Sequence, residues 1–337
     1  MKNIIGAKTL PAAAEVRFLT VDDESAGQRL DNFLFRQLKG VPKTHVYRII
    51  RSGEVRINKG RAQAETRIAA GDVVRLPPVR VAARSEEGAT PPAPARDFPL
   101  LHEDESLLAI DKPAGVAVHG GSGVSFGVIE QLRTARPGAK FLELVHRLDR
   151  ETSGILLVAR KRSALTALQD QFRERETGKT YLALVEGDWP AAKKVLDAPL
   201  AKYLLADGER RVRVVAKEHA DAMRAITLVK VLARFSLPGD KQPVSLLAVT
   251  IKTGRTHQIR VHLASAGHAI AGDDKYGDFE RNRALQKSGL KRMFLHAWRL
   301  QFNHPGDGRR VALQAALPPE LAVLLPPATL SETEKYD

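Results

Sequence analysis

One segment of the sequence gathers side chains that could do chemistry. Residues 144–160 read LVHRLDRETSGILLVAR, in which Asp149 follows an apolar run and stands shortly before Thr152 and Gly154. The apolar residues after Gly154 predict a buried strand, so Asp149 would lie at the edge of a folded core. A carboxylate at such a place could attack or stabilise an electron-poor carbon. From spacing alone, however, a solvent-exposed or capping carboxylate is the commoner outcome.

The rest of the sequence excludes several common site types. It has no cysteine, which rules out disulfides and thiolate metal ligands. It has no P-loop, no H-E-x-x-H and no G-x-S-x-G motif, and the glycines of residues 120–127 do not have dinucleotide-binding spacing. His257 and His262 stand five positions apart beside arginines, which disfavours a dication. We therefore expect chemistry by carboxylate, hydroxyl, imidazole or guanidinium groups, without metal or cofactor.

The charge of the chain points to a polyanionic partner. Lys and Arg number 53 against 39 Asp and Glu, a net charge of +14. Between Gly27 and Arg80 there are 12 basic and 4 acidic residues, so this stretch supplies +8 of that total. Clustered basic residues displace the counterions condensed on nucleic-acid phosphates. A basic surface that serves only solubility stays open as the alternative.

Local patterns predict the elements that carry this charge. Apolar residues at helical spacing predict a first helix from Leu30 to Leu38 and a second helix capped by Thr44 and ended by Gly53. Residues 55–60 then alternate and reach Asn-Lys-Gly, which predicts a strand and a turn. The candidate RNA-binding residues of the second helix and the hairpin are Lys43, Arg48, Arg51, Arg56, Lys59 and Arg61.

Composition divides the chain into five stretches. We expect an irregular leader (1–17), a small RNA-binding module (18–80), a linker rich in Ala, Pro, Ser and Glu (81–97), a long catalytic domain (98–320) and a C-terminal tail (321–337). Many short β-like runs with interspersed helical stretches predict an α+β fold, with a mixed, mainly antiparallel sheet and flanking helices. No stretch has the length of a membrane span and the start lacks a secretory signal, so we expect a cytoplasmic protein.

Two families share these motifs. The helix, helix and hairpin containing GEVRIN resemble the alpha-L (S-four type) RNA-binding module. HRLDRETSG at 146–154 is similar to the signature of the RluA-type pseudouridine synthases, although Glu151 stands where an Asp is frequent. The resemblance covers nearly the whole chain, because further stretches follow in that family's order: DKPAGVAVHGG (111–121), KTYLALVEG (179–187), KTGRTHQIRVHL (252–263) and FLHAWRLQF (294–302).

The resemblance implies roles for particular residues. It implies isomerisation of uridine to pseudouridine, with Asp149 as the catalytic carboxylate and no cofactor. Arg260 is implied as the cation that pairs with Asp149, and Arg255 is the second candidate for that position. Tyr181 would stack on the everted uracil, and its hydroxyl is implied as the group that removes the proton from carbon five. The base must be flipped out of its helix, and Arg147 would assist as a wedge or phosphate contact.

The same resemblance implies a substrate. Within the family, the similarity is to enzymes of ribosomal large-subunit RNA, which implies three separated uridines in 23S ribosomal RNA, free or in an assembling particle. The alternatives are other large-subunit uridines, a non-catalytic ribosome assembly factor and a hydrolytic RNA glycosylase. We expect a monomer with no membrane partner and no nucleotide cofactor. Lys112 and His119 are weaker candidates for structural or RNA contacts.

Overall fold

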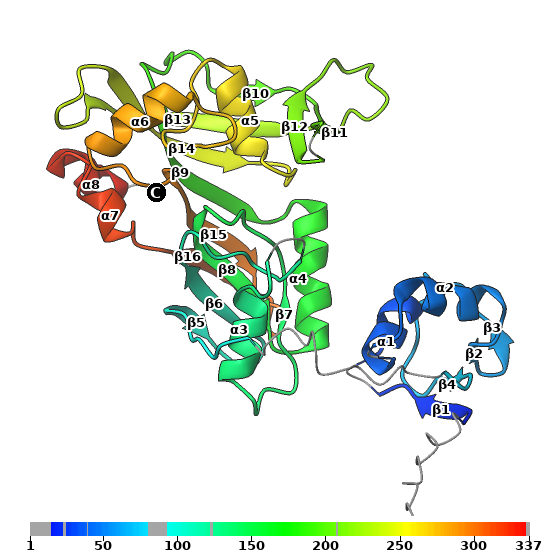
Figure 1. The fold of residues 1–337 in the computed structure, drawn as a ribbon. Helices are drawn as coiled ribbons and strands as arrows, with labels where there is room; N and C mark the ends of the chain where they lie inside the picture. Colours follow the sequence, from blue (N-terminus) through cyan, green and yellow to red (C-terminus); the bar gives the residue numbers. More distant parts are fainter. Residues whose placement is uncertain are drawn as a thin grey trace, which may run out of the picture. The chain divides into compact units, whose positions relative to one another are not determined.

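The chain divides between Pro91 and Pro92 into two compact units. The computed structural model describes residues 15–22, 25–38, 40–79, 93–121, 124–206 and 208–334 (Figure 1). Residues 331–334 are described by their backbone alone. The division falls within the stretch expected to be a linker; most of that stretch, and residues 1–14 of the expected leader, lie outside the described residues. No helix of the described part is long and apolar enough to cross a membrane.

The first unit consists of a small sheet and two helices around one apolar core. Its elements are β1 (Arg17–Thr20), α1 (Leu30–Gln37), α2 (Lys43–Arg51), β2 (Arg56–Ile57), β3 (Gly60–Arg61) and β4 (Val73–Leu76). The four strands pair antiparallel in the order β1-β4-β2-β3. Asn58 and Lys59 both have positive φ, 48° and 69°, which is the conformation of a tight hairpin turn. The predicted helices and hairpin are therefore confirmed.

The predicted cap of α2 is wrong. Its N-cap is Pro42, and no side chain caps the helix, because Thr44 lies inside the first turn instead of before it. The end of the helix is as predicted, since Gly53 follows it with a φ of +75° that favours glycine. Val46, Ile49 and Ile50 of α2 are buried in the core of the unit, which leaves the charged side chains of the helix exposed.

The second unit contains the remaining elements. Its strands are β5 (Leu100–Glu103), β6 (Leu107–Lys112), β7 (Glu143–Leu144), β8 (Ser153–Ala159), β9 (Gly178–Glu186), β10 (Val195–Asp197), β11 (Leu200–Leu204), β12 (Arg210–Val214), β13 (Ile226–Ser236), β14 (Pro243–Ile251), β15 (Leu295–Asn303) and β16 (Arg310–Gln314). Its helices are α3 (Val128–Ala135), α4 (Arg162–Glu174), α5 (Gln258–Ser265), α6 (Phe279–Lys287), α7 (Pro319–Ala322) and α8 (Pro327–Glu334).

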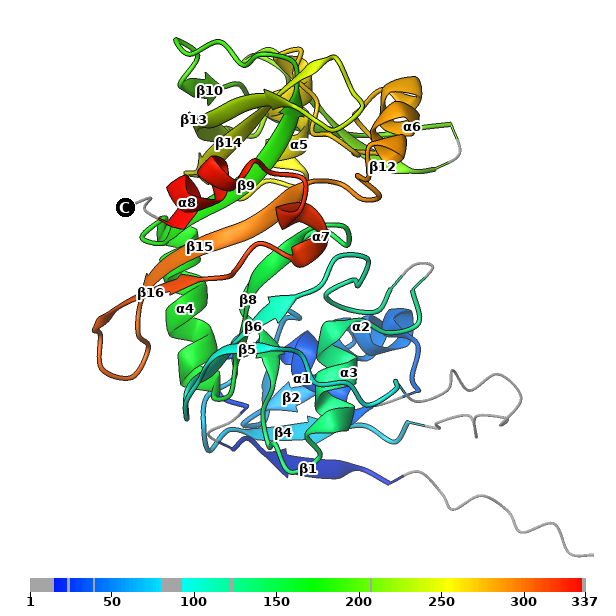
Figure 2. The ribbon, with the colours of Figure 1, turned by 90° about the vertical axis from the view of Figure 1, so that its left-hand side faces the viewer.

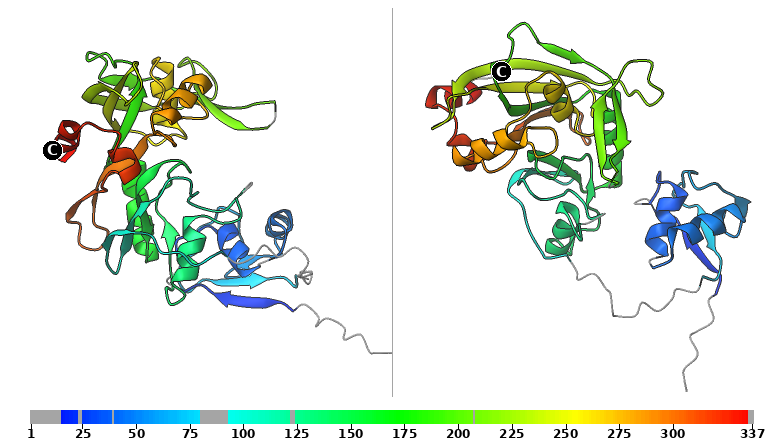
Figure 3. Two further views of the ribbon diagram at one scale, coloured as in Figure 1. Left: turned by 60° about the vertical axis from the view of Figure 1, so that its left-hand side comes forward. Right: turned by 45° about the horizontal axis from the view of Figure 1, so that its top comes forward.

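Ten of these strands form one sheet. The order is β10-β13-β14-β9-β15-β8-β6-β5, with β16 paired to β15 and β7 paired to β8. Every pair is antiparallel except β15 and β8, which are parallel. The mixed, mainly antiparallel sheet with flanking helices is the predicted α+β fold. Strands β11 and β12 form a separate ribbon (Figure 3), whose Leu200 and Val212 pack with Val261 of α5.

Helices cover both faces of the large sheet. On one face, α4 packs over Leu157 and α6 and α7 pack over Leu246. On the other face, α3 packs over Leu156 and α5 packs over Leu247 (Figures 1 and 2). Tyr181 of β9 contacts the α3 cluster and the α5 cluster together. The middle of this second face is therefore where the two halves of the unit meet.

The last described residues pack on the second unit. Leu321 is fully buried, and Leu324 and Leu325 are also buried, in the cluster that contains Leu285 of α6. The stretch expected to be a tail therefore begins with residues that belong to the folded core, because its leucines have an apolar surface to cover.

Candidate active site

Asp149 lies in a loop that is fixed by the strand after it. The loop joins β7 to β8, and all seven residues of β8 are buried. Gly154 in β8 has a φ of +107°, and a side chain there would collide with the backbone of Ala297 in the parallel strand β15. Glycine is therefore required for the two strands to approach. This contact fixes the backbone five residues after Asp149.

A buried lysine fastens the same loop from the other side. The ammonium of Lys112 donates hydrogen bonds to the carbonyls of Pro113 (2.8 Å), Val116 (2.9 Å) and Arg150 (3.1 Å). The Gly115 N–H also donates to the Arg150 carbonyl, at 2.9 Å. Burial lowers the pKa of Lys112 to about 7, and three carbonyl acceptors match its three N–H donors. Since Lys112 is fully buried, its role is structural and it cannot contact RNA.

Arg260 is the cation beside Asp149. Its Nη1 lies 3.3 Å from Oδ2 of Asp149, while its Nε and Nη2 each donate to Asp273 at 2.7 Å. The Arg260 side chain is 4% exposed, and that of Asp149 is 21% exposed. Although burial opposes the charge, the bonds to Asp273 raise the pKa of Arg260, with a further contribution from Asp149. A rigid guanidinium therefore holds a carboxylate that solvent can still reach.

The other two candidate arginines do not pair with Asp149 in the structure. Arg255 donates its Nε hydrogen bond to the carbonyl of Arg224, at 3.2 Å. Arg147 is exposed at the mouth of the site. The ion-pair partner of Asp149 in the structure is therefore Arg260 and not Arg255.

Tyr181 lines the inner part of the site. It lies in β9, where its neighbours across the ladder are Val249 and Ala297. Burial raises the pKa of its phenol, and the negative charge of Asp149 raises it further. The phenol is therefore protonated at neutral pH, which suits a ring that stacks and a hydroxyl that donates. It makes the predicted removal of a proton by this hydroxyl harder.

His257 is a site residue whose position was not predicted, because it was considered only as a metal ligand. Its Nε2 lies 3.9 Å from Oδ2 of Asp149, and its Nδ1 lies 2.8 Å from the hydroxyl of Tyr276. The Tyr276 oxygen accepts the Val212 N–H at 3.1 Å, so its own proton is free to go to Nδ1. Burial lowers the pKa of His257, which keeps the ring neutral. When Tyr276 donates to Nδ1, the neutral ring carries its own proton on Nε2, facing Asp149.

Two adjoining hollows meet at these residues. The outer one has a volume of about 370 Å³ and includes His119 and Lys275 in its wall. The inner one has a volume of about 120 Å³ and includes Tyr181 in its wall. The residues common to both walls are Arg147, Leu148, Asp149, His257 and Arg260. Asp149 thus stands where a narrow cavity, suited to one ring, opens into a wider one.

No group of three His, Cys, Asp or Glu residues in the described part of the chain is arranged to hold a metal ion. His262 is instead fully buried, with Nδ1 2.9 Å from the Thr227 hydroxyl and Nε2 2.8 Å from the Ala198 carbonyl. Asp273 and Tyr276, which fix Arg260 and His257, were also not predicted. Their signal in the sequence was the string GDDKYGD at 272–278, which begins nine positions after the end of KTGRTHQIRVHL.

The six basic residues predicted to bind RNA are in the first unit, and all six are exposed: Lys43, Arg48, Arg51, Arg56, Lys59 and Arg61. Arg48 has a long ion pair with Glu54, at 3.4 Å. Arg56 donates to the carbonyls of Gly53 (3.3 Å) and Lys59 (3.2 Å), which ties it to its own hairpin. They are spread over α2 and the β2–β3 hairpin, as predicted.

Known families match both units. The family described as RNA pseudouridylate synthase matches residues 106–265, and the S4 domain matches residues 28–74. Ribosomal large subunit pseudouridine synthase C of Pasteurella multocida (strain Pm70) is 50% identical over 313 residues, which are 92% of this chain and 93% of that protein. The protein of the same name from Escherichia coli (strain K12) is 51% identical over 307 residues, 90% of this chain and 93% of that protein.

Solved structures agree with this match. Human RNA pseudouridylate synthase domain containing 1 has a TM-score of 0.57 and 25% identity, and the match covers 75% of this chain and 98% of that one. Human RNA pseudouridylate synthase domain containing 4 has a TM-score of 0.54 and 27% identity, with 70% and 92% covered.

Proposed function

The chain belongs to the RNA pseudouridine synthases, and from that premise we propose that Asp149 starts the isomerisation of specific uridines in 23S ribosomal RNA. The reaction breaks the bond between ribose and the uracil nitrogen, turns the base and rejoins it through carbon five. The proton lost from carbon five is balanced by the one gained at the freed nitrogen. No electron is gained or lost, and no water is consumed.

The two hollows at Asp149 would hold different parts of the substrate nucleotide. A uridine flipped from its helix would place its base in the inner hollow against Tyr181, and stacking on an aromatic ring contributes about 1–3 kcal/mol. The ribose and phosphates would occupy the outer hollow, near Arg147 and His119. Asp149 would then meet the sugar carbon at the junction. His257, with a proton on Nε2, would donate to the uracil oxygen on which charge develops as the bond breaks.

The observation that carries this proposal is the ion pair of Asp149 and Arg260. Arg260 is buried and fixed by Asp273, so it orients the carboxylate of Asp149, which solvent can still reach. An exposed or capping aspartate, the alternative left open by the sequence, would not need a buried guanidinium.

Replacing the carboxylate tests the proposal. Asp149→Asn and Asp149→Ala should reduce pseudouridine formation in isolated 23S ribosomal RNA by about 1,000-fold or more, since the attacking or charge-stabilising group is lost. RNA affinity should change little. Asp274→Asn is the matched control, because Asp274 also lies near Arg260, at 3.6 Å, but is 76% exposed. Equal turnover in the Asp149 variants and the wild type would refute the role given to Asp149.

The choice of uridines is a separate part of the proposal. The two bacterial relatives are named for the ribosomal large subunit. From the family resemblance of the sequence we infer three separated uridines of 23S ribosomal RNA as targets. Other large-subunit uridines are the alternative. Mapping pseudouridine across ribosomal RNA from cells lacking this protein decides between them, because only true targets lose the modification. Release of free uracil in the same assay would instead indicate a glycosylase.

The remaining partners follow from this substrate. We propose that the protein acts as a monomer in the cytoplasm, where ribosomal RNA is processed, and that it needs neither a membrane nor a nucleotide cofactor. The basic first unit would hold the RNA near the catalytic unit. A non-catalytic assembly factor would use the first unit alone and would leave the arrangement around Asp149 without a purpose.

A further inference from the structure

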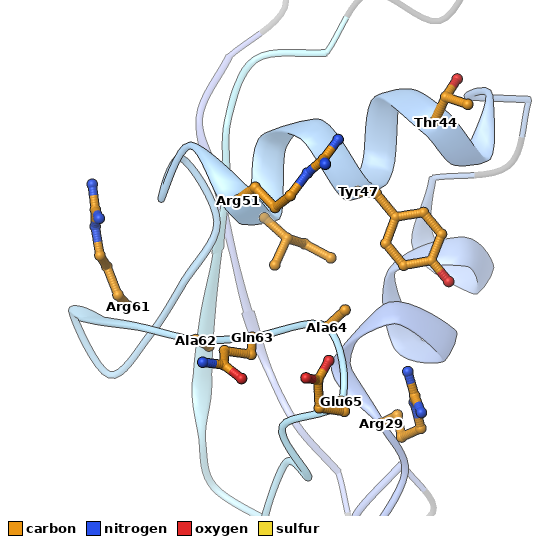
Figure 4. Close-up of a pocket in the computed structure, with 10 residues that line it drawn as sticks. Arg29, Thr44, Tyr47, Arg51, Arg61, Ala62, Gln63, Ala64 and Glu65 are labelled. Carbon is orange, nitrogen blue, oxygen red and sulfur yellow. The ribbon is translucent and has the colours of Figure 1, made fainter.

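The first unit has a hollow of its own that the proposed reaction does not use. It has a volume of about 860 Å³ and lies between α2 and the segment 61–65 that follows the hairpin (Figure 4). Ile50, Ala62 and Ala64 contribute apolar surface to its wall. Contacts with a phosphate backbone do not require an apolar cavity, so these contacts leave the hollow unexplained.

Tyr47 presents an aromatic ring at this hollow. The side chain is 37% exposed, although it is large and apolar. The rings of Phe35 and Tyr47 form a T-shaped pair with their centroids 5.7 Å apart. The Tyr47 hydroxyl donates to Oδ2 of Asp31 at 3.3 Å. Asp31 is itself buried and paired with Arg29 at 2.7 Å. The ring is thus held by Phe35 and by the bond of its hydroxyl, while Figure 4 shows it beside the open space.

The charges at the hollow favour a polyanion. Arg51 and Arg61 are exposed at its wall, and within the described residues no carboxylate pairs with either guanidinium. Arg29 is a third arginine of the wall, but its charge is balanced by the ion pair with Asp31. Glu65 is the acidic residue of the wall. Two exposed guanidinium groups at the wall of an apolar, aromatic cavity match a ligand with a flat apolar body and adjoining phosphates.

We infer that this hollow binds one unpaired nucleotide of the RNA, with its base stacked on Tyr47 and its flanking phosphates at Arg51 and Arg61. Ile50 and the two alanines would cover the edges of the base. Every base has a face that can stack, so the site would select an unpaired position and not a particular base. The first unit would then recognise a bulge or loop in the RNA, in addition to the uridine that enters the catalytic unit.

Binding by the full-length chain tests this inference. The two probes are an RNA hairpin with one bulged adenosine and the fully paired hairpin with the same number of phosphates. Both are closed by a flexible linker without bases, so that the bulge is the unpaired nucleotide, and both lack uridine so that the Asp149 site has no substrate. Tyr47→Leu should weaken binding of the bulged hairpin by about 5- to 150-fold and that of the paired one by less than about 2-fold. The salt dependence of binding should not change. Tyr47→Phe keeps the ring and should bind both probes like the wild type.

The arginines give a second, different signature. Arg51→Gln and Arg61→Gln should each lower the slope of log K against log salt by about one for the bulged hairpin. Arg36→Gln is the matched control, because Arg36 is exposed in α1 and lies outside the hollow.

Three outcomes would overturn the inference. One is an equal loss on both hairpins in Tyr47→Leu, which indicates a general effect on binding; another is no loss on either. The third is displacement of the bulged hairpin by polyglutamate, which indicates an acidic peptide site. Ultraviolet crosslinking of the wild type to the bulged hairpin is independent of folding in any variant, and should join the nucleotide to the peptide that contains Tyr47. Loss of turnover in Asp149→Asn is unaffected by any of these results, so the proposed function stands or falls separately.

Discussion

The two units use arginine in opposite ways. In the first unit, Arg51 and Arg61 are exposed and have no carboxylate partner among the described residues. In the second unit, the Arg260 side chain is 4% exposed and has three carboxylates within 4 Å, those of Asp149, Asp273 and Asp274. An exposed guanidinium exchanges counterions with phosphates, and salt screens it. A buried guanidinium is fixed, is weakly screened and sets the position of its neighbour. Burial, and not charge, therefore separates the arginines that bind RNA from the arginine that positions a carboxylate.

The largest expected effect on catalysis comes from replacing the buried arginine, Arg260. Arg260→Lys keeps the charge but loses the fork that grips Asp273 and Asp149 together, and Arg260→Gln loses the charge as well. Both should lower kcat for pseudouridine formation by about 100- to 1,000-fold, with the salt dependence of RNA binding unchanged. Steady-state rates at several salt concentrations measure this.

Arg255→Gln is the control for that experiment. Arg255 lines the inner hollow but bonds the Arg224 carbonyl, so its loss should affect KM more than kcat. Comparable falls in kcat for Arg255→Gln and Arg260→Lys would contradict the distinction drawn here.

The sequence predicted the local structure better than the site. The apolar periodicities that predicted α1, α2 and the strands are local features of the sequence. The structure confirms these elements because each one places its apolar face on a core. The cap of α2 was misplaced because Pro42 already starts the helix. Asp149 and Arg260 are 111 positions apart, and their pairing came from family resemblance. Asp273 and Tyr276 were missed because their roles depend on contacts that only the folded chain creates.

Replacing exposed basic residues of the first unit should have a smaller effect, and it should act on RNA binding. Replacing Lys43, Arg48 and Arg51 together by Gln should weaken RNA binding roughly tenfold at low salt and lower the salt slope by about three. The value of kcat at saturating RNA should not change, because none of the three lies at the Asp149 hollows. Binding isotherms at five or six salt concentrations measure both quantities.

The matched control removes as much charge from the second unit. Lys161, Arg173 and Arg309 are equally exposed and line neither of the hollows at Asp149. Their triple replacement by Gln should leave the salt slope nearly unchanged. A slope change as large as that of the first triple variant would mean that the RNA contacts of this protein are not concentrated in the first unit.

The smallest expected effect is that of low pH on the stability of each unit. It should differ between the units because their histidines differ in burial. His146 and His296 are in the second unit, and burial lowers their pKa values to about 3 and about 4. In the unfolded chain both would titrate near 6.5, so between about pH 6.5 and 4 only the unfolded chain takes up these protons. The free energy of unfolding of the second unit should therefore fall as the pH falls, by up to about 1.4 kcal/mol per pH unit for each histidine.

The first unit should not share this sensitivity. Its one histidine, His45, is not buried. Burial raises the pKa of Asp31, but the hydrogen bonds that its carboxylate accepts, above all that from Arg29, together outweigh burial and lower this pKa from its ordinary value of 3.8. The stability that the Asp31–Arg29 pair contributes is therefore lost only below about pH 3.8. Hydrogen exchange resolved by unit, from pH 6.5 to 4.5, measures the two stabilities separately. His146→Gln, whose amide oxygen can still accept the Leu157 N–H, should flatten the slope of the second unit, whereas His45→Gln should change neither. Parallel slopes in the two units would mean that buried imidazoles do not set the acid response, and that burial separates the units less sharply than their arginines indicate.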